Sequence, residues 1–403
     1  MNLKIMHIIP SLAKGGAERL VLDICNSLNT RDDCTIKLVT LNDINEYIFL
    51  SKNIDIVNCK SQFKLSFFGK HSINIDNFIK IVNNFKPDII HSHLYEAELV
   101  SREHIFKSIA YITHLHDNIK ELAPASTKLL TSKTIFTRFY EKQRLLKKYI
   151  SCNNNFIAIS EDVKKYAFNA LPKKLHNIFL LHNAIDFKRF NRNISEKINS
   201  FNELRLVTIG SLVDKKNQIF LVNSCKILKN YGINFKLNIL GDGPNYEIIK
   251  NRIIELDLTD NIFLQGKVNN VEDYLFNSDF YVHSAIYEPF GLVLIEAMAT
   301  GLPCITLDGK GNRDIIINDF NGFLLNNNID YKSFAEKILY YWQNRESYKI
   351  MSKNAIIFAK KYNINIYCDN LMKIYKKILK FRTPDLLLTI NILQIGFSQA
   401  QLS

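Results

Sequence analysis

The chain has 403 residues and a net charge of +13, with 47% hydrophobic and 23% charged residues. This length exceeds the size at which a single hydrophobic core stops growing, so two domains are expected. The composition is that of an ordinary globular protein. No apolar run approaches the roughly 18 residues that a membrane-spanning helix requires.

Positive charge is concentrated in the first half of the chain. Residues 1–200 carry 29 Lys and Arg against 19 Asp and Glu, and residues 201–403 carry 23 against 20. The densest basic segment is 120–148, with eight basic residues and two acidic ones. Such a segment favours an anionic membrane surface, although a compositional bias towards Lys and Asn explains it equally well. The sequence holds no nucleic-acid-binding motif, so no nucleic acid is expected as a partner.

Cysteine usage and the N-terminal residues indicate the compartment. The seven cysteines are scattered, without a Cys-x-x-Cys pair, which favours a reducing environment and argues against disulfides or a zinc site. The apolar run 5–9 ends at Pro10 and leads into Gly15-Gly16, so it predicts a strand and a turn rather than a signal peptide. A cytoplasmic protein is therefore expected.

Short apolar runs alternate with helical patterns along the first half of the chain. The predicted strands are 4–9, 35–41, 54–58, 88–91, 110–113 and 155–159, and the predicted helices are 17–29, 74–85, 95–107, 132–150 and 161–169. This alternation predicts a doubly wound parallel sheet with crossover helices.

The second half repeats the plan. The predicted strands are 204–209, 236–240, 261–264, 280–283 and 304–306, and the predicted helices are 218–230, 245–256, 271–277, 291–300, 331–343, 346–361 and 365–380. The fold class expected is α/β, with two Rossmann-like doubly wound parallel-sheet domains that face a central cleft. Ligands of such sheets bind beyond the carboxyl ends of the strands.

Two loops that follow strands carry residues suited to phosphate. Gly15 and Gly16 open a helix after the first strand, where the backbone can approach an anion closely. Lys215 and Lys216 follow the strand 204–209, where lysines can neutralise a leaving diphosphate. A structural turn and ordinary surface lysines are the alternative interpretations.

Two histidine pairs are spaced by two residues. His91 and His93, and His114 and His116, would each share one face of a strand and could bind a metal. No Cys or Glu cluster completes such a site. Hydrogen-bonded scaffold histidines are expected, and no metal site is predicted.

The segment from Glu288 to Pro303 is the most informative one. Glu296 is the only acidic or basic side chain between Pro289 and Leu307, and so apolar a stretch predicts that it is deeply buried. A buried carboxylate needs a partner. That partner is either a structural Arg or amide, or a ligand hydroxyl, and the Pro-Phe-Gly turn before it favours the ligand.

Glu-Pro-Phe-Gly-Leu at 288–292, Glu-Ala-Met-Ala at 296–299 and Gly-Leu-Pro at 301–303 resemble the signature of retaining GT-B glycosyltransferases of family 4. Gly15-Gly16, Lys216, the Gly-Asp-Gly-Pro turn 241–244 and the segment 182–186 also match the family's motifs. The resemblance therefore spans almost the whole chain. It departs at Ser211, where the family carries an Arg, and at Ala184, where it carries a Gly.

The resemblance implies two groups of functional residues. The catalytic residues would be His116, Glu288 and Lys216, with Glu288 on the transferred sugar, Lys216 on the leaving diphosphate and His116 near the anomeric carbon, its tautomer fixed by Asp117. The substrate-binding residues would be Gly15, Gly16, Phe290, Gly291, Leu292, Glu296, Ser211 and Lys215. Among these, Glu296 would bind the nucleotide ribose, and the amides of 290–292 the sugar phosphate.

The resemblance also implies a division of the chain. An acceptor-side domain would span 1–190 and a donor-nucleotide domain 191–363. A helix at 364–381 would cross back onto the first domain, and the tail 382–403 has no assigned role.

The expected activity is retaining, metal-independent hexosyl transfer. The donor would be a nucleotide-diphosphate sugar, UDP-linked, and the acceptor a glycan or a lipid-linked glycan of bacterial surface polysaccharide, such as lipopolysaccharide or capsule. No cofactor is expected, and the protein would be cytoplasmic or peripheral on the inner face of the cytoplasmic membrane. Two alternatives stay open: a sugar-nucleotide epimerase of the same fold, and a non-catalytic sugar-nucleotide-binding partner.

Overall fold

The protein is described by a computed structural model that covers residues 2–61, 63–64, 72–119, 122, 133–191 and 202–381. The tail 382–403 and much of the basic segment 120–148 lie outside these residues. The chain forms two compact units. The N-terminal unit contains the chain up to Ile159, Val163–Leu181 and the chain from Asn365, and the C-terminal unit contains Ser160–Asp162 and His182–Ile364.

The N-terminal unit is built on a seven-stranded sheet whose paired strands are all parallel, in the order β3-β2-β1-β6-β7-β8-β9. Its strands are β1 (Leu3–Ile9), β2 (Cys34–Thr40), β3 (Ile56–Asn58), β6 (Ile89–His93), β7 (Ala110–Leu115), β8 (Asn155–Ala158) and β9 (Ile178–Leu180). β6 and β7 are buried along their whole length, as expected of parallel strands that are covered on both faces.

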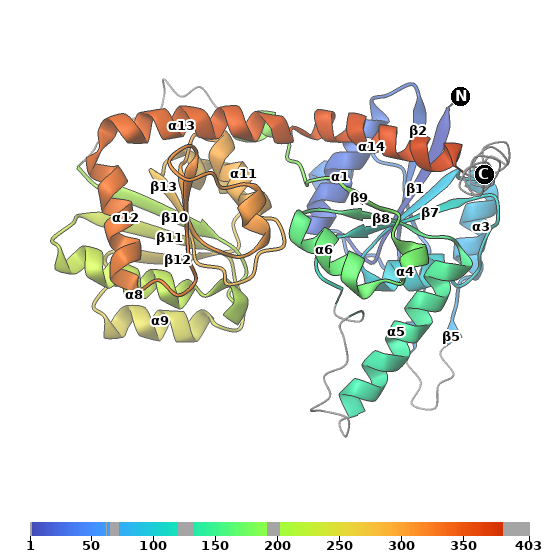
Figure 1. Ribbon diagram of the computed structural model, residues 1–403, viewed down its shortest axis with the longest axis horizontal. Coiled ribbons are helices and arrows are strands. Elements are labelled where there is room, and N and C mark those ends of the chain that lie inside the picture. The colour runs from blue at the N-terminus through green and yellow to red at the C-terminus, as the bar shows by residue number, and fades with distance from the viewer. Residues whose placement is uncertain are drawn as a thin grey trace, which may run out of the picture. The chain divides into compact units, whose positions relative to one another are not determined.

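Helices flank this sheet, and Figure 1 shows them around its strands. They are α1 (Gly16–Asn29), α2 (Ile48–Ser51), α3 (Asp76–Phe85), α4 (Tyr95–Ser101), α5 (Lys133–Ser151), α6 (Glu161–Ala170) and α14 (Ile364–Lys380). A separate antiparallel pair is formed by β4 (Phe63–Lys64) and β5 (Ser72–Ile73).

The C-terminal unit repeats this plan with a six-stranded sheet, again parallel at every pairing, in the order β12-β11-β10-β13-β14-β15. Its strands are β10 (Leu204–Ile209), β11 (Phe235–Leu240), β12 (Ile262–Gly266), β13 (Phe280–His283), β14 (Cys304–Leu307) and β15 (Gly322–Leu325). Its helices are α7 (Phe187–Phe190), α8 (Gln218–Asn230), α9 (Tyr246–Glu255), α10 (Val271–Phe276), α11 (Leu292–Ala299), α12 (Tyr331–Gln343) and α13 (Arg345–Ala359).

The prediction of two Rossmann-like parallel-sheet domains is confirmed. Sequence analysis missed the outer strands β9 and β15 and the short β4–β5 pair. β9 has three residues and β15 begins at Gly322, so neither carries a long apolar run. Both are sheet edges, where pairing on one side only requires less apolar sequence.

Both sheets reverse their strand order at one point. The reversal lies between β1 and β6 in the N-terminal unit and between β10 and β13 in the C-terminal unit. Crossover connections leave in opposite directions from such a point, so the loops that follow the two strands diverge and leave room for a ligand. The loops after β1, β6, β10 and β13 are therefore where functional residues are expected.

The last helix, α14, packs on the N-terminal unit. Asp369 pairs with Arg31 at 2.6 Å, and Lys376 pairs with Asp33 at 3.2 Å. Tyr375 points inwards from the same helix and is fully buried. α14 thereby brings a side chain from near the end of the described chain to the central strands of the N-terminal sheet.

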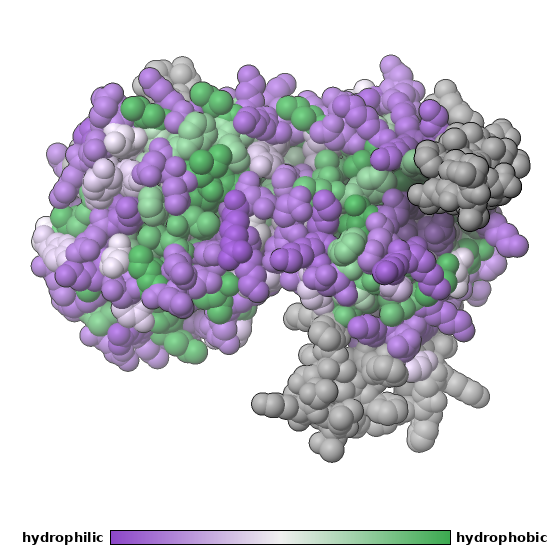
Figure 2. Space-filling view, in the orientation of Figure 1, coloured by the Kyte–Doolittle hydropathy of each residue, from purple (hydrophilic) through white to green (hydrophobic). Residues whose placement is uncertain are grey.

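Among the described residues, no helix is both long and apolar enough to cross a membrane. Hydrophilic and hydrophobic residues are interspersed over the visible face of both units (Figure 2). The helices of both units accordingly bury one face and expose the other, as shown by α1 and α12.

A substitution at Gly241 tests the close packing of the loops that follow β10 and β11 in the C-terminal unit. It has a φ of +133°, and a Cβ at this position would lie 2.1 Å from the carbonyl oxygen of Gly210. Gly232 is a matched control, because its φ is +69° and a Cβ would meet nothing within 4 Å. Gly241→Ala should destabilise the C-terminal unit by at least about 3 kcal/mol, and Gly232→Ala by about 1 kcal/mol.

The measurement is denaturant unfolding followed by the fluorescence of Trp342, the only tryptophan of the chain, which lies in α12 of the same unit. Equal midpoints for the two variants would show that the loops are not packed as described.

Candidate functional site

The loops after β10 and β13 are bonded to each other. The Ser284 hydroxyl donates to the carbonyl oxygen of Lys216 at 2.9 Å, and the amide of Ile286 donates to the carbonyl of Lys215 at 3.0 Å. Lys216 ends the 3₁₀ turn Asp214–Lys216. These bonds fix the backbone of the two lysines beside the segment that leads to Glu288.

Glu288 is the centre of this arrangement. Its side chain forms an ion pair with the Lys216 ammonium, and its carboxylate lies 3.2 Å from Nε2 of His283, the last residue of β13. Glu288 is 7% exposed and His283 2%. A buried carboxylate is therefore held between one lysine and one histidine, beyond the carboxyl ends of β10 and β13.

The charge state of this carboxylate follows from two opposing effects. Burial acts to raise the pKa of Glu288, but Lys216 and His283 outweigh it and lower the pKa from 4.5 to about 2. The pKa of His283 is itself lowered by burial, against the opposing effect of Glu288. Glu288 is therefore an ionised acceptor of hydrogen bonds throughout the neutral range.

A glycine-containing loop holds the backbone of Glu288 in place. The Glu288 amide donates to the carbonyl of Gly309 at 2.8 Å, and the Gly311 amide donates to the carbonyl of Glu288 at 3.0 Å. A Cβ on Gly311 would lie 2.0 Å from the carbonyl oxygen of Pro289. Only glycine therefore allows this approach, and the glutamate's position is set by the loop after β14.

The turn after Glu288 opens helix α11. Gly291 caps the helix with a φ of +101°, a conformation that favours glycine. The amides of Phe290, Gly291 and Leu292 donate no hydrogen bond to any other described residue. Unbonded amides and the positive end of the helix dipole together favour an anion at this position.

Glu296 differs from the expectation. It lies in the second turn of α11 and is partly exposed, so the prediction that it is deeply buried is wrong. The apolar residues around it bury the other faces of the helix, including Leu294, Ile295 and Met298. The buried carboxylate of this segment is Glu288, whose partners come from other loops and are not visible in the local sequence.

Ser211 and Lys215 lie in the same loop as Lys216 but are exposed. The Lys215 ammonium lies 5.8 Å from the centre of the Tyr287 ring, and the Lys310 ammonium lies at the same distance from that ring. Two further cations thus adjoin the segment that carries Glu288.

The glycine loop of the N-terminal unit is held by Tyr47. The Gly15 amide donates to the Tyr47 hydroxyl at 3.1 Å, and this hydroxyl donates to the Gly15 carbonyl. Gly16 begins α1 and is exposed. The Glu18 carboxylate lies over Gly15, where a Cβ would come within 2.2 Å of its oxygen. Burial raises the pKa of Glu18.

His116 belongs to a group of histidines. Its Nε2 lies 2.9 Å from Nδ1 of His93, and burial lowers its pKa to about 3. Two sets of three histidines have ring nitrogens within 4.8 Å of one another: His7, His91 and His93, and His93, His114 and His116. The sequence indicated the two pairs but not His7, whose partners are far away along the chain.

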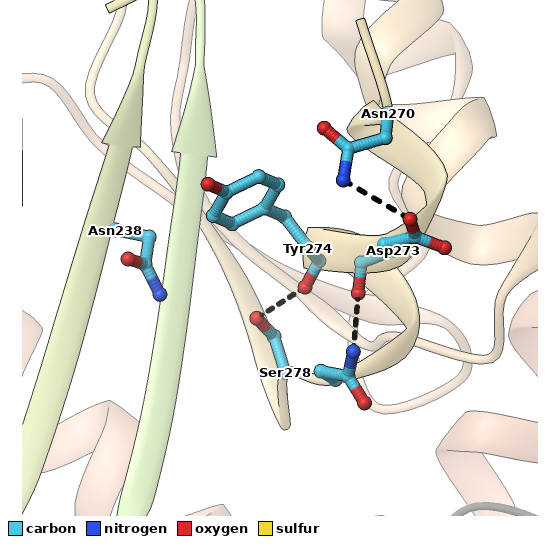
Figure 3. Close-up of a pocket in the computed structure, with 6 residues that line it drawn as sticks. Asn238, Asn270, Asp273, Tyr274 and Ser278 are labelled. Carbon is cyan, nitrogen blue, oxygen red and sulfur yellow. Dashed lines mark hydrogen bonds between the residues drawn. The ribbon is translucent and has the colours of Figure 1, made fainter. Parts of the chain in front are cut away.

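A pocket of about 350 Å³ lies elsewhere in the C-terminal unit, between β11 and α10. It is lined by Asn238, Asn270, Asp273, Tyr274, Asn277 and Ser278 (Figure 3). The Ser278 hydroxyl donates to the Tyr274 carbonyl, and the Asn270 amide donates to Asp273. It contains none of the predicted site residues, and its polar groups are bonded to one another or, for the Asn238 oxygen and the Tyr274 hydroxyl, to Gln265.

The structure thus brings together one part of the predicted site within the C-terminal unit. Lys216 pairs with Glu288, and the amides of 290–292 follow directly. Gly15, Gly16 and His116 belong to the N-terminal unit. His283, Gly309 and Gly311 were missed. For His283, the only signal in the sequence was its position as a histidine at the end of a buried strand.

Comparison with known proteins agrees with this geometry. The family model "Glycosyltransferase Family 4" matches residues 14–189, and "Glycosyl transferases group 1" matches residues 190–358. The chain belongs to the GT-B glycosyltransferases of family 4, so the predicted family is confirmed.

The named relatives include a capsular polysaccharide enzyme and a galactosyltransferase. The capsular polysaccharide biosynthesis glycosyltransferase CapH of Staphylococcus aureus is 26% identical over 93% of this chain and 98% of its own length. The UDP-Gal:alpha-D-GlcNAc-diphosphoundecaprenol alpha-1,3-galactosyltransferase of Escherichia coli is 26% identical over 68% of this chain and 71% of its own.

Solved structures share the fold. The crystal structure of Anabaena Alr3699/HepE in complex with UDP and glucose matches with a TM-score of 0.73 at 17% identity, over 93% of this chain and 100% of that chain.

The ion pair of Glu288 predicts a pH dependence of stability. A carboxyl with a folded pKa of about 2 and an ordinary value of 4.5 stabilises the fold by about 3 kcal/mol above pH 4.5. This contribution is lost as the pH falls towards 2, because the depressed pKa favours the ionised form. The free energy of unfolding of the wild type should exceed that of Glu288→Gln at pH 6, and the gap should shrink to about 1 kcal/mol by pH 2.5.

Trp342 fluorescence during urea unfolding measures the gap at each pH. A gap that stays constant from pH 6 to pH 2.5 would contradict an ionised, paired Glu288.

Proposed function

We propose that the protein is a retaining, metal-independent glycosyltransferase. It transfers a sugar from a nucleotide-diphosphate sugar, with UDP as the nucleotide, to a glycan or lipid-linked acceptor in bacterial surface polysaccharide synthesis. The observation that carries the proposal is the buried, ionised Glu288 paired with Lys216 beside the open amides of 290–292.

Lys216 and Glu288 have complementary roles in this proposal. A diphosphate competes with Glu288 for the Lys216 ammonium, and a carboxylate relieved of part of that pairing accepts hydrogen bonds from sugar hydroxyls. The same pair thus binds a phosphate on one side and a sugar on the other. Neither an isolated phosphate nor a neutral sugar would satisfy both groups.

The remaining residues of the C-terminal unit extend this contact. The amides of Phe290, Gly291 and Leu292 bind phosphate oxygens at the start of α11. Glu296, which is partly exposed, accepts hydrogen bonds from the ribose hydroxyls. Ser211 and Lys215 line the diphosphate, with Lys215 supplying the second cation.

In the N-terminal unit, Gly15 and Gly16 contact the diphosphate and His116 contacts the donor sugar. A phosphate at Gly15 must displace the Glu18 carboxylate or meet it in its protonated form, which the raised pKa of Glu18 favours. Residues 1–190 serve as the acceptor side, 191–363 bind the donor nucleotide, and 364–381 return the chain to the first part.

The reaction needs no group beyond these. The bond between the anomeric carbon and the phosphate oxygen breaks, and its electron pair leaves with the phosphate. The acceptor oxygen bonds the anomeric carbon on the same face and its proton passes to the departing phosphate oxygen. Lys216 and the α11 amides stabilise the charge that develops there, which is the role a metal ion has in other transferases.

The acceptor class and the nucleotide are supported by the relatives. The Escherichia coli relative is named for a UDP sugar and a diphosphoundecaprenol acceptor, and a Campylobacter jejuni relative is named for a diphospho-undecaprenol glycan. The net charge of +13 suits an anionic acceptor at the inner face of the cytoplasmic membrane.

A non-catalytic sugar-nucleotide-binding protein is the second candidate, because Ser211 replaces the Arg of the family's motif. Incubation with a panel of UDP and GDP sugars and a lipid-diphosphate glycan distinguishes the two. Release of nucleoside diphosphate with acceptor supports the transferase, and saturable binding without release supports the binder. Isomerised donor without release would instead identify an epimerase.

Lys216→Met should lower turnover by roughly 100-fold or more, since one charge-stabilising group of the transition state is lost. Lys250→Met, on the exposed side of α9, removes the same charge from the same unit and should change turnover less than about twofold. The kcat with saturating donor measures both. Equal effects of the two substitutions would refute the role of Lys216.

Ser211→Arg restores the cation that the family's motif has. It should raise kcat/KM by roughly three- to tenfold, because an exposed position beside the diphosphate gains a charge-assisted contact. Steady-state kinetics with varied donor is the measurement, with Ser211→Gln as the uncharged control of similar length. A loss of activity in the Arg variant alone would show that this loop does not face the diphosphate.

A further inference from the structure

Five histidines and one tyrosine of the N-terminal unit form a continuous hydrogen-bonded chain, here named the histidine ladder. Its members in order are His116, His93, His7, Tyr375, His91 and His114. The contacts are 2.9 Å from His116 Nε2 to His93 Nδ1, 3.0 Å from His93 Nε2 to His7 Nδ1, 3.5 Å from His7 Nε2 to the Tyr375 hydroxyl, 2.7 Å from that hydroxyl to His91 Nδ1, and 3.2 Å from His91 Nε2 to His114 Nδ1.

The sheet brings these side chains together. His7 of β1 is in register with His91 of β6, and His93 of β6 is in register with His114 of β7. Residues two apart on a strand share a face, so His91 and His93 both point to this side, where α14 supplies Tyr375. All members except His116 are at most 1% exposed, and His116 is partly exposed.

The buried imidazoles are neutral. Burial lowers the pKa of His7 to about 3 and the pKa values of His91 and His93 well below the ordinary value. A neutral imidazole has one N–H donor and one acceptor nitrogen. Each internal imidazole must therefore donate on one side and accept on the other. The Tyr375 hydroxyl has one proton and two lone pairs, so if it donates to one neighbouring histidine it must accept from the other, and the direction of the whole chain follows.

Tyr375 decides that direction. We assign the Tyr375 proton to the 2.7 Å contact, in which the hydroxyl donates to His91 Nδ1, because O–H donors make shorter contacts on average than N–H donors do. The 3.5 Å contact is then the one in which His7 Nε2–H donates to the Tyr375 oxygen.

Following the chain outwards from Tyr375 gives the state of His116. His7 Nδ1 has no proton and accepts from His93 Nε2–H. His93 Nδ1 then accepts from His116 Nε2–H. His116 is left with an unprotonated Nδ1, which can accept a hydrogen bond but cannot donate one.

We propose that the histidine ladder is a positioning device that holds His116 as its Nε2–H tautomer and so presents an acceptor nitrogen to the substrate. The inference rests on the proposed contact of His116 with the donor sugar and makes it specific. The partner of Nδ1 must be a hydroxyl that donates, because a fully ionised phosphate oxygen can only accept. In this proposal the ladder takes the role that the resemblance gave to Asp117, which was expected to fix the tautomer of His116.

The same bonds argue against a metal ion in the ladder. In the direction set by Tyr375, the Nδ1 atoms of His7, His91 and His93 each accept a hydrogen bond. A metal would need several of these lone pairs to turn towards one point, which would break the chain at more than one contact.

Tyr375→Phe tests the inference, because it removes only the hydroxyl and keeps the ring that packs edge-on against His91 at 5.8 Å. Tyr367→Phe is the matched control. Tyr367 is buried in the same helix, but its hydroxyl bonds to no described residue. The protein is labelled with ¹⁵N-histidine, and the tautomer of each ring is read from its Nδ1 and Nε2 chemical shifts.

The wild type and Tyr367→Phe should show His116 as the Nε2–H form, and Tyr375→Phe should show a mixture of tautomers at His116 and His93. Turnover of Tyr375→Phe should fall about tenfold with the affinity for UDP unchanged. His116 as the Nδ1–H form in the wild type, or an unchanged His116 in Tyr375→Phe, would overturn the inference. So would a stoichiometric transition metal bound by the ladder, found by elemental analysis of the purified protein.

The tautomer measurement does not depend on activity. If His116 is the Nε2–H tautomer but the protein transfers no sugar, the proposed function is refuted and the inference about the histidine ladder still holds. If the protein transfers sugar but the Tyr375→Phe substitution leaves the histidine tautomers unchanged, only the inference about the histidine ladder is refuted.

Discussion

The candidate site of the C-terminal unit depends on one buried negative charge, the Glu288 carboxylate. The buried Glu288 carboxylate would destabilise the fold if it had no partners. Lys216 forms an ion pair with it, and His283 lies 3.2 Å from it. The loop 309–311 forms hydrogen bonds with the Glu288 backbone. Lys216 follows β10, His283 ends β13 and the loop 309–311 follows β14, so the carboxylate joins segments on both sides of the point where strand order reverses. Removing any one partner would leave the others with an uncompensated group, so the three loops hold one another in place.

The N-terminal unit also buries polar side chains at the point where its strand order reverses, but these side chains are uncharged. Its polar groups at the same topological point are neutral imidazoles, and they are satisfied by one another and by Tyr375. A chain of neutral rings has only two directions, so it transmits the choice made at Tyr375 to His116 without any movement of the backbone. One unit thus holds a buried charge, and the other holds a fixed pattern of hydrogen-bond donors and acceptors.

The fold was largely predictable from the sequence, because short strands rich in apolar residues, such as β1 and β10, alternate with periodic helices. The site was predictable only where a motif is local, as in Glu288-Pro289-Phe290-Gly291. Local sequence misled at Glu296, whose apolar neighbours suggested burial, whereas the helix exposes one side. His7, His283 and Gly311 act through partners at long range along the chain, and no local pattern records such contacts.

The most direct measurement of the central claim is the titration of Glu288 itself, by ¹³C NMR of protein labelled at the glutamate side-chain carboxyls, with and without UDP. The Glu288→Gln variant assigns the signal. If Lys216 is shared between the carboxylate and a diphosphate, the pKa of Glu288 should be well below 4.5 in the free protein and should rise when UDP binds. A pKa at or above 4.5 in the free protein, or one that UDP leaves unchanged, would contradict the account.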